Sequence, residues 1–300
     1  MTRHRLAETG RRVLDLSEIG IPEVPVFGCY EYSSVRAGLQ EHSHPGIIEI
    51  CFLERGHQTY RVGGLEYRLA GGDVFVTKPG EPHDTAGQPE DRGKLYWINL
   101  RMIQPRGPFL SLPRPDAEAL TQALLSIPKR CFPGSDILKV IFDEVFQAYD
   151  QEHHSLTRVC ITNLLVRSLL AVIECSRRLG STRCSPIIKR LMQRIDSRPE
   201  ENYSLSALAG ESALSLSRFK ARFKHETGIA PHDFILRSKV EAAKKMLALE
   251  DLTITDIAMR LNFSSSQYFA TVFKRCTMQT PTEFRSGGTE IPLRDIEVTS

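Results

Sequence analysis

The apolar positions form three successive patterns along the chain, and each predicts a different kind of structure. Between residues 24 and 105, short apolar runs such as IIEICFL (47–53) and DVFVT (73–77) are broken by Gly, Pro or Asp every eight to twelve residues. Runs of this length and spacing are typical of strands joined by turns. The N-terminal third is therefore expected to form a small β-barrel or sandwich.

From Asp116 to Leu179, apolar residues recur at helical spacing, which predicts a set of helices. The expected helix between 155 and 179 has a broad apolar face, made by Leu164, Leu165, Val166, Leu169, Leu170 and Ile173. Such a face either packs against the barrel or forms a contact between two copies of the chain. The segment GSTRCSP (180–186) follows, and its Gly, Ser and Pro predict a linker.

From Ile187 the pattern is helical throughout, and one short pattern occurs twice. The segments 205–228 and 254–281 each read as a short amphipathic helix, a tight turn, and a second helix that begins at serine and ends in basic residues. A phenylalanine pair four residues apart, Phe219 with Phe223 and Phe269 with Phe273, marks the buried face of each second helix. This is the pattern of a helix-turn-helix, whose second helix can enter the DNA major groove.

The polar residues beside these phenylalanines have side chains suited to DNA. Gln pairs with adenine, Lys donates to guanine, and Arg and Lys bind phosphates. The candidate DNA-binding residues are Ser217, Arg218, Lys220, Ala221, Arg222 and Lys224 in the first unit, and Ser265, Ser266, Gln267, Thr271, Lys274 and Arg275 in the second. The charge distribution also favours DNA binding by this region, because residues 186–286 include 16 basic and 11 acidic residues. The first 185 residues have equal numbers of basic and acidic residues.

At these residues the chain resembles the DNA-binding domain of the AraC/XylS family of bacterial transcription regulators. The matching positions are Leu208-Ala209, Ser215, Phe219, Phe223-Lys224, Gly228, Pro231, Ile257-Ala258, Phe263, Ser265, Phe269, Phe273-Lys274, Pro281 and Phe284-Arg285. The resemblance implies that both helix-turn-helix units bind one DNA duplex. It places base contacts at Ser217, Lys220, Ala221, Ser266, Gln267 and Thr271. Asn262 and Met278 stand where the family has glycine, and we expect the turn near Met278 to differ from the family shape.

The N-terminal region holds a second group of residues with shared chemistry. His42, His44 and Glu49 follow one another in the order HxH, four residues, Glu, and the segment GDVFVTKPGEPH (72–83) ends in His83. His42 and His44 alternate on an expected strand, so both side chains point to one face. The two segments resemble the two motifs of the cupin barrel, which precedes the DNA-binding domain in many members of the same regulator family.

Three interpretations of these four residues stay open. Three imidazoles and a carboxylate suit a divalent metal such as zinc, nickel, iron or manganese. The same residues can instead contact an organic effector directly, or be structural. Strand alternation adds inward candidates, and the full candidate effector pocket is His42, His44, Glu49, Tyr60 or Arg61, His83, Trp97 and Asn99. An aromatic side chain among hydrogen-bonding groups suits a sugar or another small polar molecule.

The expected fold is a two-domain α+β chain: an N-terminal cupin-like β-barrel with flanking helices, and a C-terminal all-α domain with two helix-turn-helix units. The expected boundaries are 1–115 for the barrel, 116–180 for a helical coupling and dimerisation segment, 181–186 for a linker, 187–286 for the DNA-binding domain and 287–300 for a flexible tail. No membrane span or signal peptide is visible. Seven scattered cysteines without a CxxC pair predict reduced thiols and a cytoplasmic protein.

These observations predict a sequence-specific DNA-binding transcription regulator whose barrel senses a small molecule, a carbohydrate by the family resemblance. The expected partners are double-stranded DNA, the effector, a second copy of the chain and, for an activator, RNA polymerase. The alternative is a metal-dependent cupin enzyme fused to a DNA-binding module. Its only support is the set of His42, His44, Glu49 and His83, so we expect no enzyme.

Overall fold

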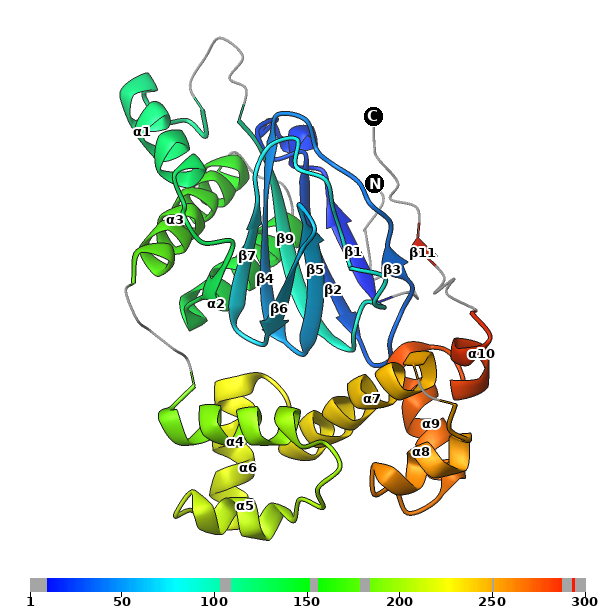
Figure 1. Ribbon diagram of the computed structural model, residues 1–300. Coiled ribbons are helices and arrows are strands. Elements are labelled where there is room, and N and C mark those ends of the chain that lie inside the picture. Colours follow the sequence, from blue (N-terminus) through cyan, green and yellow to red (C-terminus); the bar gives the residue numbers. More distant parts are fainter. Residues whose placement is uncertain are drawn as a thin grey trace. The chain divides into compact units, whose positions relative to one another are not determined.

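The computed structural model describes residues 10–102, 109–151, 156–178, 184–249, 251–287 and 293–294. The chain forms two compact units (Figure 1). Unit 1 comprises Met1–Tyr32, Glu41–Asp84 and Gly93–Ser181, and unit 2 comprises Ser33–Gln40, Thr85–Arg92 and Thr182–Ser300. Unit 2 therefore contains two short segments from the N-terminal half of the chain, which the sequence pattern does not reveal.

Unit 1 is built on two antiparallel sheets. The larger has the strand order β1-β2-β9-β4-β7-β10 and the smaller has the order β6-β5-β8. Their strands are β1 (Arg11–Leu14), β2 (Val26–Tyr32), β4 (Ile47–Arg55), β5 (His57–Val62), β6 (Leu65–Ala70), β7 (Asp73–Thr77), β8 (His83–Asp84), β9 (Gly93–Arg101) and β10 (Cys131–Pro133). Tyr60 of the smaller sheet stacks on Phe75 of the larger one, with ring centroids 4.8 Å apart, so the two sheets face each other.

Alternation along the strands gives the larger sheet two different faces. The outer face carries Ile48, Ile50, Tyr96, Ile98 and Leu100, which join the main hydrophobic core. This core also contains residues of the helices α1 (Arg114–Leu125), α2 (Asp136–Asp150) and α3 (Thr157–Arg177). The other face, which we call the inner face, turns toward the smaller sheet. Glu49 lies on it directly opposite Asn99, and Cys51 lies opposite Trp97.

Helix α3 packs much of its apolar face into the core of unit 1. Leu165, Leu169 and Ile173 are buried in the core of unit 1, whereas Leu170 is 55% exposed. By length and composition alone this helix could also cross a membrane, which differs from the sequence expectation, but half of its most apolar stretch is buried inside the unit. Burial of this kind is that of a core helix.

The structure differs from the sequence expectation at three places in unit 1. Strand β1 lies before the β-rich pattern expected between residues 24 and 105, and β10 lies within the segment expected to be helical. His42 and His44 do not lie on a continuous strand; His42 forms an isolated bridge with His83, and β4 begins only at Ile47. A 3-10 helix, η1 (Leu16–Ile19), connects β1 to the rest of the sheet.

Unit 2 is mainly helical, as its apolar pattern predicts. Its helices are α4 (Pro186–Ser197), α5 (Leu205–Glu211), α6 (Leu216–Thr227), α7 (Pro231–Leu249), α8 (Ile254–Arg260), α9 (Ser266–Thr277) and α10 (Pro281–Arg285). One core gathers Ile188, Leu208, Phe219 and Phe223, and a separate core gathers Val240, Ile257, Phe269 and Phe273. Helix α7 contributes to both cores, so it joins two helix-turn-helix units, each with its own interior.

The two non-helical segments of unit 2 have defined contacts. In the segment Thr85–Arg92, Asp91 pairs with Arg237 and Arg92 pairs with Asp233, both on α7. Lys244, also on α7, donates to the Gln88 side chain at 2.7 Å. In the other segment, β3 (Gly38–Leu39) pairs in parallel with β11 (Leu293–Arg294). Most of the expected tail, 287–300, and the first half of the expected linker, 181–183, lie outside the described residues.

Candidate nucleic-acid interface and ligand site

The two helix-turn-helix units share their local construction. Ser215 and Ser265 are the N-caps of α6 and α9, and their hydroxyls accept hydrogen bonds from the backbone N–H groups of Arg218 and Tyr268. Capping of this kind fixes where the second helix of each unit begins. The rings of Phe219 and Phe223 lie 5.7 Å apart, as do those of Phe269 and Phe273, and all four are fully buried.

The candidate DNA-binding residues lie on the opposite, outward side of α6 and α9. Ser217, Arg218, Lys220, Ala221, Arg222, Lys224, Ser265, Gln267, Thr271, Lys274 and Arg275 are exposed, and Ser266 is half-buried. Tyr268 is also exposed on α9, although it packs edge-on against Phe263. The sequence pattern alone does not single out Tyr268, because a tyrosine beside Phe269 resembles a core residue. Its position between Gln267 and Thr271 would have indicated an outward ring.

Several of these side chains form hydrogen bonds within unit 2, among them Ser266, which donates to Oε1 of Gln267 at 3.4 Å. Arg222 donates to Glu226 at 2.6 Å, and Glu226 also accepts from the backbone and hydroxyl of Ser185 at the start of α4. Thr271 donates to the carbonyl of Gln267 at 3.0 Å. Arg222 is therefore held by a carboxylate, whereas Lys220 and Lys224 on the same helix are exposed.

The backbone at Met278 has the same conformation as the corresponding position of the first unit, Gly228. Met278 ends α9 with φ 66°, and Gly228 ends α6 with φ 74°. The backbone N–H of Met278 donates to the Lys274 carbonyl, and that of Gly228 donates to the Lys224 carbonyl, each at a distance of 2.8 Å. Met278 thus adopts the left-handed conformation that glycine takes in the first unit, and the surrounding structure offsets its strain.

Replacing Met278 with glycine is therefore expected to stabilise the protein. A side chain in left-handed backbone costs about 1–2 kcal/mol, so the gain should be about 1 kcal/mol after the lost methionine contacts. The free energy of unfolding in urea measures the change. Gly228→Met is the mirror control and should lower stability by a similar amount. A destabilised Met278→Gly variant would show that packing of the methionine outweighs backbone strain.

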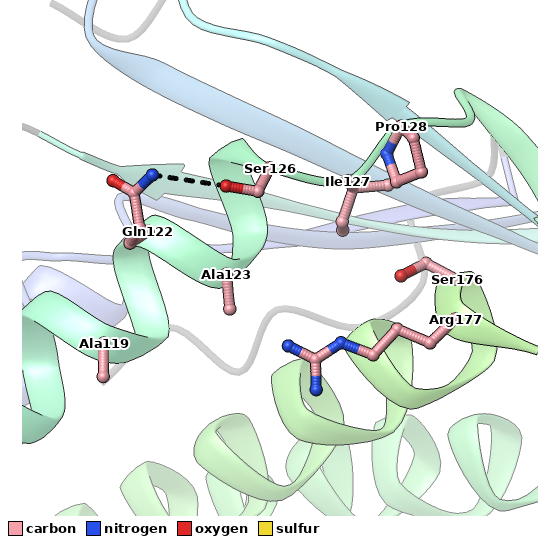
Figure 2. Close-up of a pocket in the computed structure, with 8 residues that line it drawn as sticks. All are labelled: Ala119, Gln122, Ala123, Ser126, Ile127, Pro128, Ser176 and Arg177. Atoms are coloured by element: carbon pink, nitrogen blue, oxygen red, sulfur yellow. Dashed lines mark hydrogen bonds between the residues drawn. The ribbon is translucent and has the colours of Figure 1, made fainter.

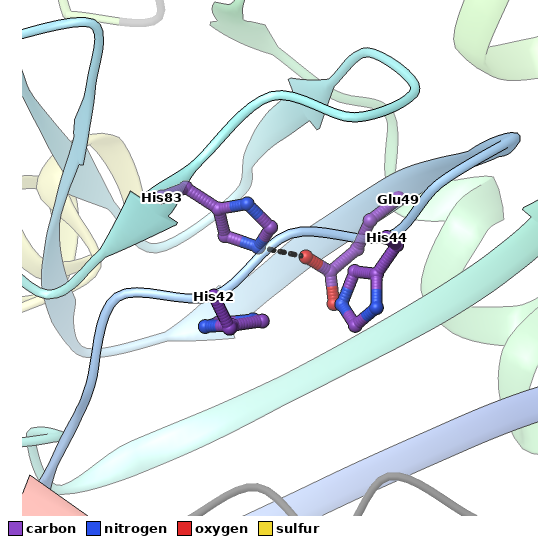
Figure 3. A group of neighbouring side chains, drawn as sticks. All are labelled: His42, His44, Glu49 and His83. Atoms are coloured by element: carbon purple, nitrogen blue, oxygen red, sulfur yellow. Dashed lines mark hydrogen bonds and ion pairs between the residues drawn. The ribbon is translucent and has the colours of Figure 1, made fainter. Parts of the chain in front are cut away.

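The four residues of the cupin-like motifs converge on one point at the inner face (Figure 3). One potential ligand atom from each of His42, His44, Glu49 and His83 lies within 4.8 Å of all the others. Nε2 of His83 is 2.8 Å from Oε2 of Glu49, and the rings of His42 and His83 have centroids 4.1 Å apart. The irregular segment around His42 and His44 thus reaches the same place that the expected strand would have reached.

His83 is held in position from both sides. Its Nδ1 lies 2.9 Å from the Glu81 carbonyl, which accepts a hydrogen bond from it, and Nε2 is directed toward Glu49. The Glu81 side chain pairs with Arg130 and accepts from the backbone N–H of Lys78. This outer group of contacts fixes the ring orientation in the way that carbonyl and carboxylate partners orient metal-binding histidines.

The electrostatics of the cluster follow from this geometry. Burial would lower the pKa of His83, but the hydrogen bond and negative charge of Glu49 outweigh it, and the pKa is raised. Burial would raise the pKa of Glu49, but the bond from His83 and the nearby imidazoles outweigh it, and the pKa is lowered. For His44 burial dominates and the pKa is lowered. The cluster therefore holds an ionised carboxylate among imidazoles.

These residues fit a divalent transition metal. Ligand nitrogens and oxygens lie about 2.0–2.2 Å from a tetrahedral zinc, so they are about 3.3–3.6 Å from one another. The four ligand atoms here all lie within 4.8 Å of one another, so small side-chain movements would bring them onto one ion. Three imidazoles and one carboxylate are ligands that zinc, nickel, iron and manganese accept. His42, His44 and Glu49 are only partly buried, so the point between them is open to a ligand.

The other effector candidates divide between the two sides of their strands. Tyr60 is buried against Phe75. Arg61 is turned to the other side of β5 and pairs with Asp84, so of these two alternatives Arg61 does not line the inner face. Trp97 and Asn99 are both buried on the inner face.

A separate pocket of about 350 Å³ lies between α1 and α3 in unit 1 (Figure 2). Ala119, Ala123, Ile127 and Pro128 contribute to its lining, and Gln122 donates to Ser126 at 3.3 Å. None of the cluster residues lines it. Since its polar groups partly satisfy each other, the inner face with its histidine cluster is the better candidate for recognising a polar ligand.

A ligand-binding barrel followed by two helix-turn-helix units defines a ligand-responsive, DNA-binding transcription regulator. Residues 24–158 match the AraC-like ligand binding domain, and residues 208–287 match a helix-turn-helix domain. With both domains in this order, the chain belongs to the AraC family of transcription regulators.

The chain is similar to several proteins of known type. The HTH-type transcriptional activator RhaS of Salmonella arizonae is 24% identical over 272 residues, covering 86% of this chain and 91% of that protein. RhaS of Escherichia coli SMS-3-5 is 24% identical over 260 residues, covering 84% and 89%. Among solved structures, the C-terminal domain of AraT, a response regulator from Geobacillus stearothermophilus, is 26% identical, covers 39% of this chain and 92% of that chain, and has a TM-score of 0.33.

Proposed function

We propose that this regulator activates transcription when a small sugar-like effector binds the inner face of its barrel. The observation that carries the proposal is the joint presence of two capped recognition helices with outward polar faces and a convergent polar cluster in the barrel. For such a switch, the effector must bind one DNA-binding arrangement of the protein more tightly than another. Activation implies contact with RNA polymerase, and the relatives named activators support that direction.

The candidate reading residue with the most specific chemistry is Gln267 at the start of α9. Its amide can pair with adenine, and alanine at this position is expected to cost about 1–3 kcal/mol at the cognate base pair. The measurement is a titration of operator DNA, selected from a random library, with substitutions at each base pair. The variant should tolerate more bases at one position. Equal loss on specific and nonspecific DNA would show that Gln267 reads no base.

We propose a divalent transition metal as part of the sensing site, held by His42, His44, Glu49 and His83. When bound there, such an ion would offer Lewis-acid coordination to effector hydroxyls. Glu81 and Arg130 would keep His83 oriented, and Glu49 would supply the negative charge that the ion requires. Direct contact between the same side chains and the effector is the alternative, and metal content distinguishes the two.

We propose a cytoplasmic homodimer without catalytic activity. The exposed apolar side chains Leu156, Val159 and Leu170 lie on or next to α3, and a partner copy would bury them. Sedimentation as a single chain at all concentrations, with and without DNA, would contradict the dimer. Metal-dependent turnover of a sugar substrate would instead support the enzyme alternative, whose motivation is the histidine and glutamate set.

A further inference from the structure

Arg11 of β1 lies on the inner face of the larger sheet. Its Cζ is 4.5 Å from the ring centroid of Trp97. Gly28 lies opposite Trp97 in the sheet, and a Cβ at position 28 would overlap the indole, so glycine allows the ring to lie across β2 toward β1. The neighbouring Arg12 points to the other side, where it pairs with Asp150 and contacts the ring of Phe146.

With its Cζ over the ring of Trp97, Arg11 has hydrogen-bond donors available for a ligand. A guanidinium stacks on an aromatic ring through its flat face, while its N–H donors point outward in the plane. Within the described residues Arg11 pairs with no carboxylate, whereas Arg12, Arg55 and Arg61 each pair with one. A positioned guanidinium with unused donors is suited to a carboxylate, which it can bind with two parallel hydrogen bonds.

Asn99 provides the second observation. It is only 7% exposed, and its Oδ1 has no hydrogen-bond partner among the described residues. Asn99 lies directly opposite Glu49, so its side chain stands beside the histidine cluster on the same face. A buried carbonyl oxygen without a donor is unfavourable, and a ligand hydroxyl would satisfy it.

These groups follow one another along the inner face. Trp97 and Asn99 are two residues apart on β9, which separates their Cα atoms by about 7 Å. Donors on Arg11 therefore lie at one end, the acceptor of Asn99 in the middle, and the cluster with Glu49 and His83 at the other end. Trp97 supports Arg11, so its ring face is not open for stacking against a sugar.

We propose that the effector is a sugar acid. Its carboxylate binds Arg11, and one of its hydroxyls donates to Oδ1 of Asn99. Its remaining hydroxyls reach the histidine cluster. This inference rests on the proposed effector site and narrows its ligand to an anionic sugar. A neutral sugar would leave the guanidinium of Arg11 without a counter-charge. Sugar phosphates share the anionic chemistry, and the test separates them from carboxylates.

The test is calorimetric titration of the full-length protein with matched ligands. The pairs are galacturonate with galactose and glucuronate with glucose, extended to five-carbon acids, with glucose 6-phosphate as the phosphate probe. We expect an acid to bind more tightly than its neutral partner. Arg11→Gln should weaken the acid about 10- to 100-fold and leave the neutral sugar unchanged. Asn99→Ala should weaken both, and Arg68→Gln, which removes an exposed charge elsewhere in the sheets, should change neither.

Several results would overturn the proposal. Equal binding of acid and neutral sugar would do so, as would unchanged acid affinity in Arg11→Gln or tighter binding of the phosphate. Arg11→Lys keeps the charge without the two-bond geometry, and it provides an intermediate loss if the glutamine variant folds poorly. Operator binding is measured in parallel. If no sugar binds while specific DNA binding persists, the sugar-acid proposal fails and the DNA-binding assignment stands; loss of both would overturn the proposed function.

Discussion

Replacing His44 with alanine is expected to remove stoichiometric divalent metal from the purified protein. His44 supplies one of four ligand atoms that lie within 4.8 Å of one another, so its loss leaves three donors and an open side. Replacing a residue that only orients a metal ligand typically lowers metal affinity about 10- to 100-fold. Replacing a direct ligand should therefore lower it about 100-fold or more. Mass spectrometric metal analysis of untagged protein, followed by zinc titration, measures the effect.

His44 is a better choice for this experiment than His83. His83 is buried and bonded to both Glu49 and Glu81, so removing it would leave the Glu49 carboxylate partly buried without its partner. Such a change commonly costs about 3–5 kcal/mol of stability and would obscure the result. His225→Ala on α6 is the control, because it removes an exposed imidazole from unit 2. Equal metal in the two variants, or none in the parent protein, would favour direct effector contacts by the cluster.

Replacing Phe273 with alanine should disable the second recognition helix. Phe273 is fully buried, touches Phe269 and Phe284 edge-on, and belongs to a core separate from that of the first unit. Truncation of a buried phenylalanine costs about 3–5 kcal/mol. Because the first unit has its own core, we expect the half-site read by α9 to lose protection in footprinting while the half-site read by α6 keeps it.

Phe223→Ala is the matched variant, since Phe223 occupies the same place in the first unit. It should produce the opposite footprint. Urea unfolding monitored by circular dichroism gives the accompanying loss of stability for each variant. If either substitution removes protection from both half-sites together, the two units fold as one cooperative body through α7, and their separate cores do not make them independent.

The sequence predicts the helical half of the protein well because its signals are local. Ser215 and Ser265 cap their helices, and the phenylalanine spacing identifies the buried face, since both effects act within one or two turns. The histidine cluster is also predicted, although the strand expected around His42 is absent. The order of the histidines and the glutamate along the chain was enough to predict that they meet, although the backbone around His42 is not the expected strand.

The remaining features depend on contacts between distant parts of the chain. Strand β1 is recognisable only through its pairing with β2, and the stacking of Arg11 on Trp97 joins residues 86 positions apart across a third strand. The choice between Tyr60 and Arg61 required the register of β5 with β8. At Met278 the sequence preference is misleading, because the surrounding fold holds this residue in the left-handed backbone conformation that methionine disfavours.

The salt-bridged segment between β8 and β9 bears on how regulators of this kind can be recombined. The sequence pattern predicts that a cut in the expected linker before α4 separates the sensing half from the DNA-binding half. Yet Asp91, which neutralises the partly buried Arg237 of α7, is encoded more than ninety residues before that cut. A hybrid gene joined at the linker would give α7 an unrelated segment in its place. An exchange that is to keep the Asp91–Arg237 ion pair must therefore carry this segment along with α7.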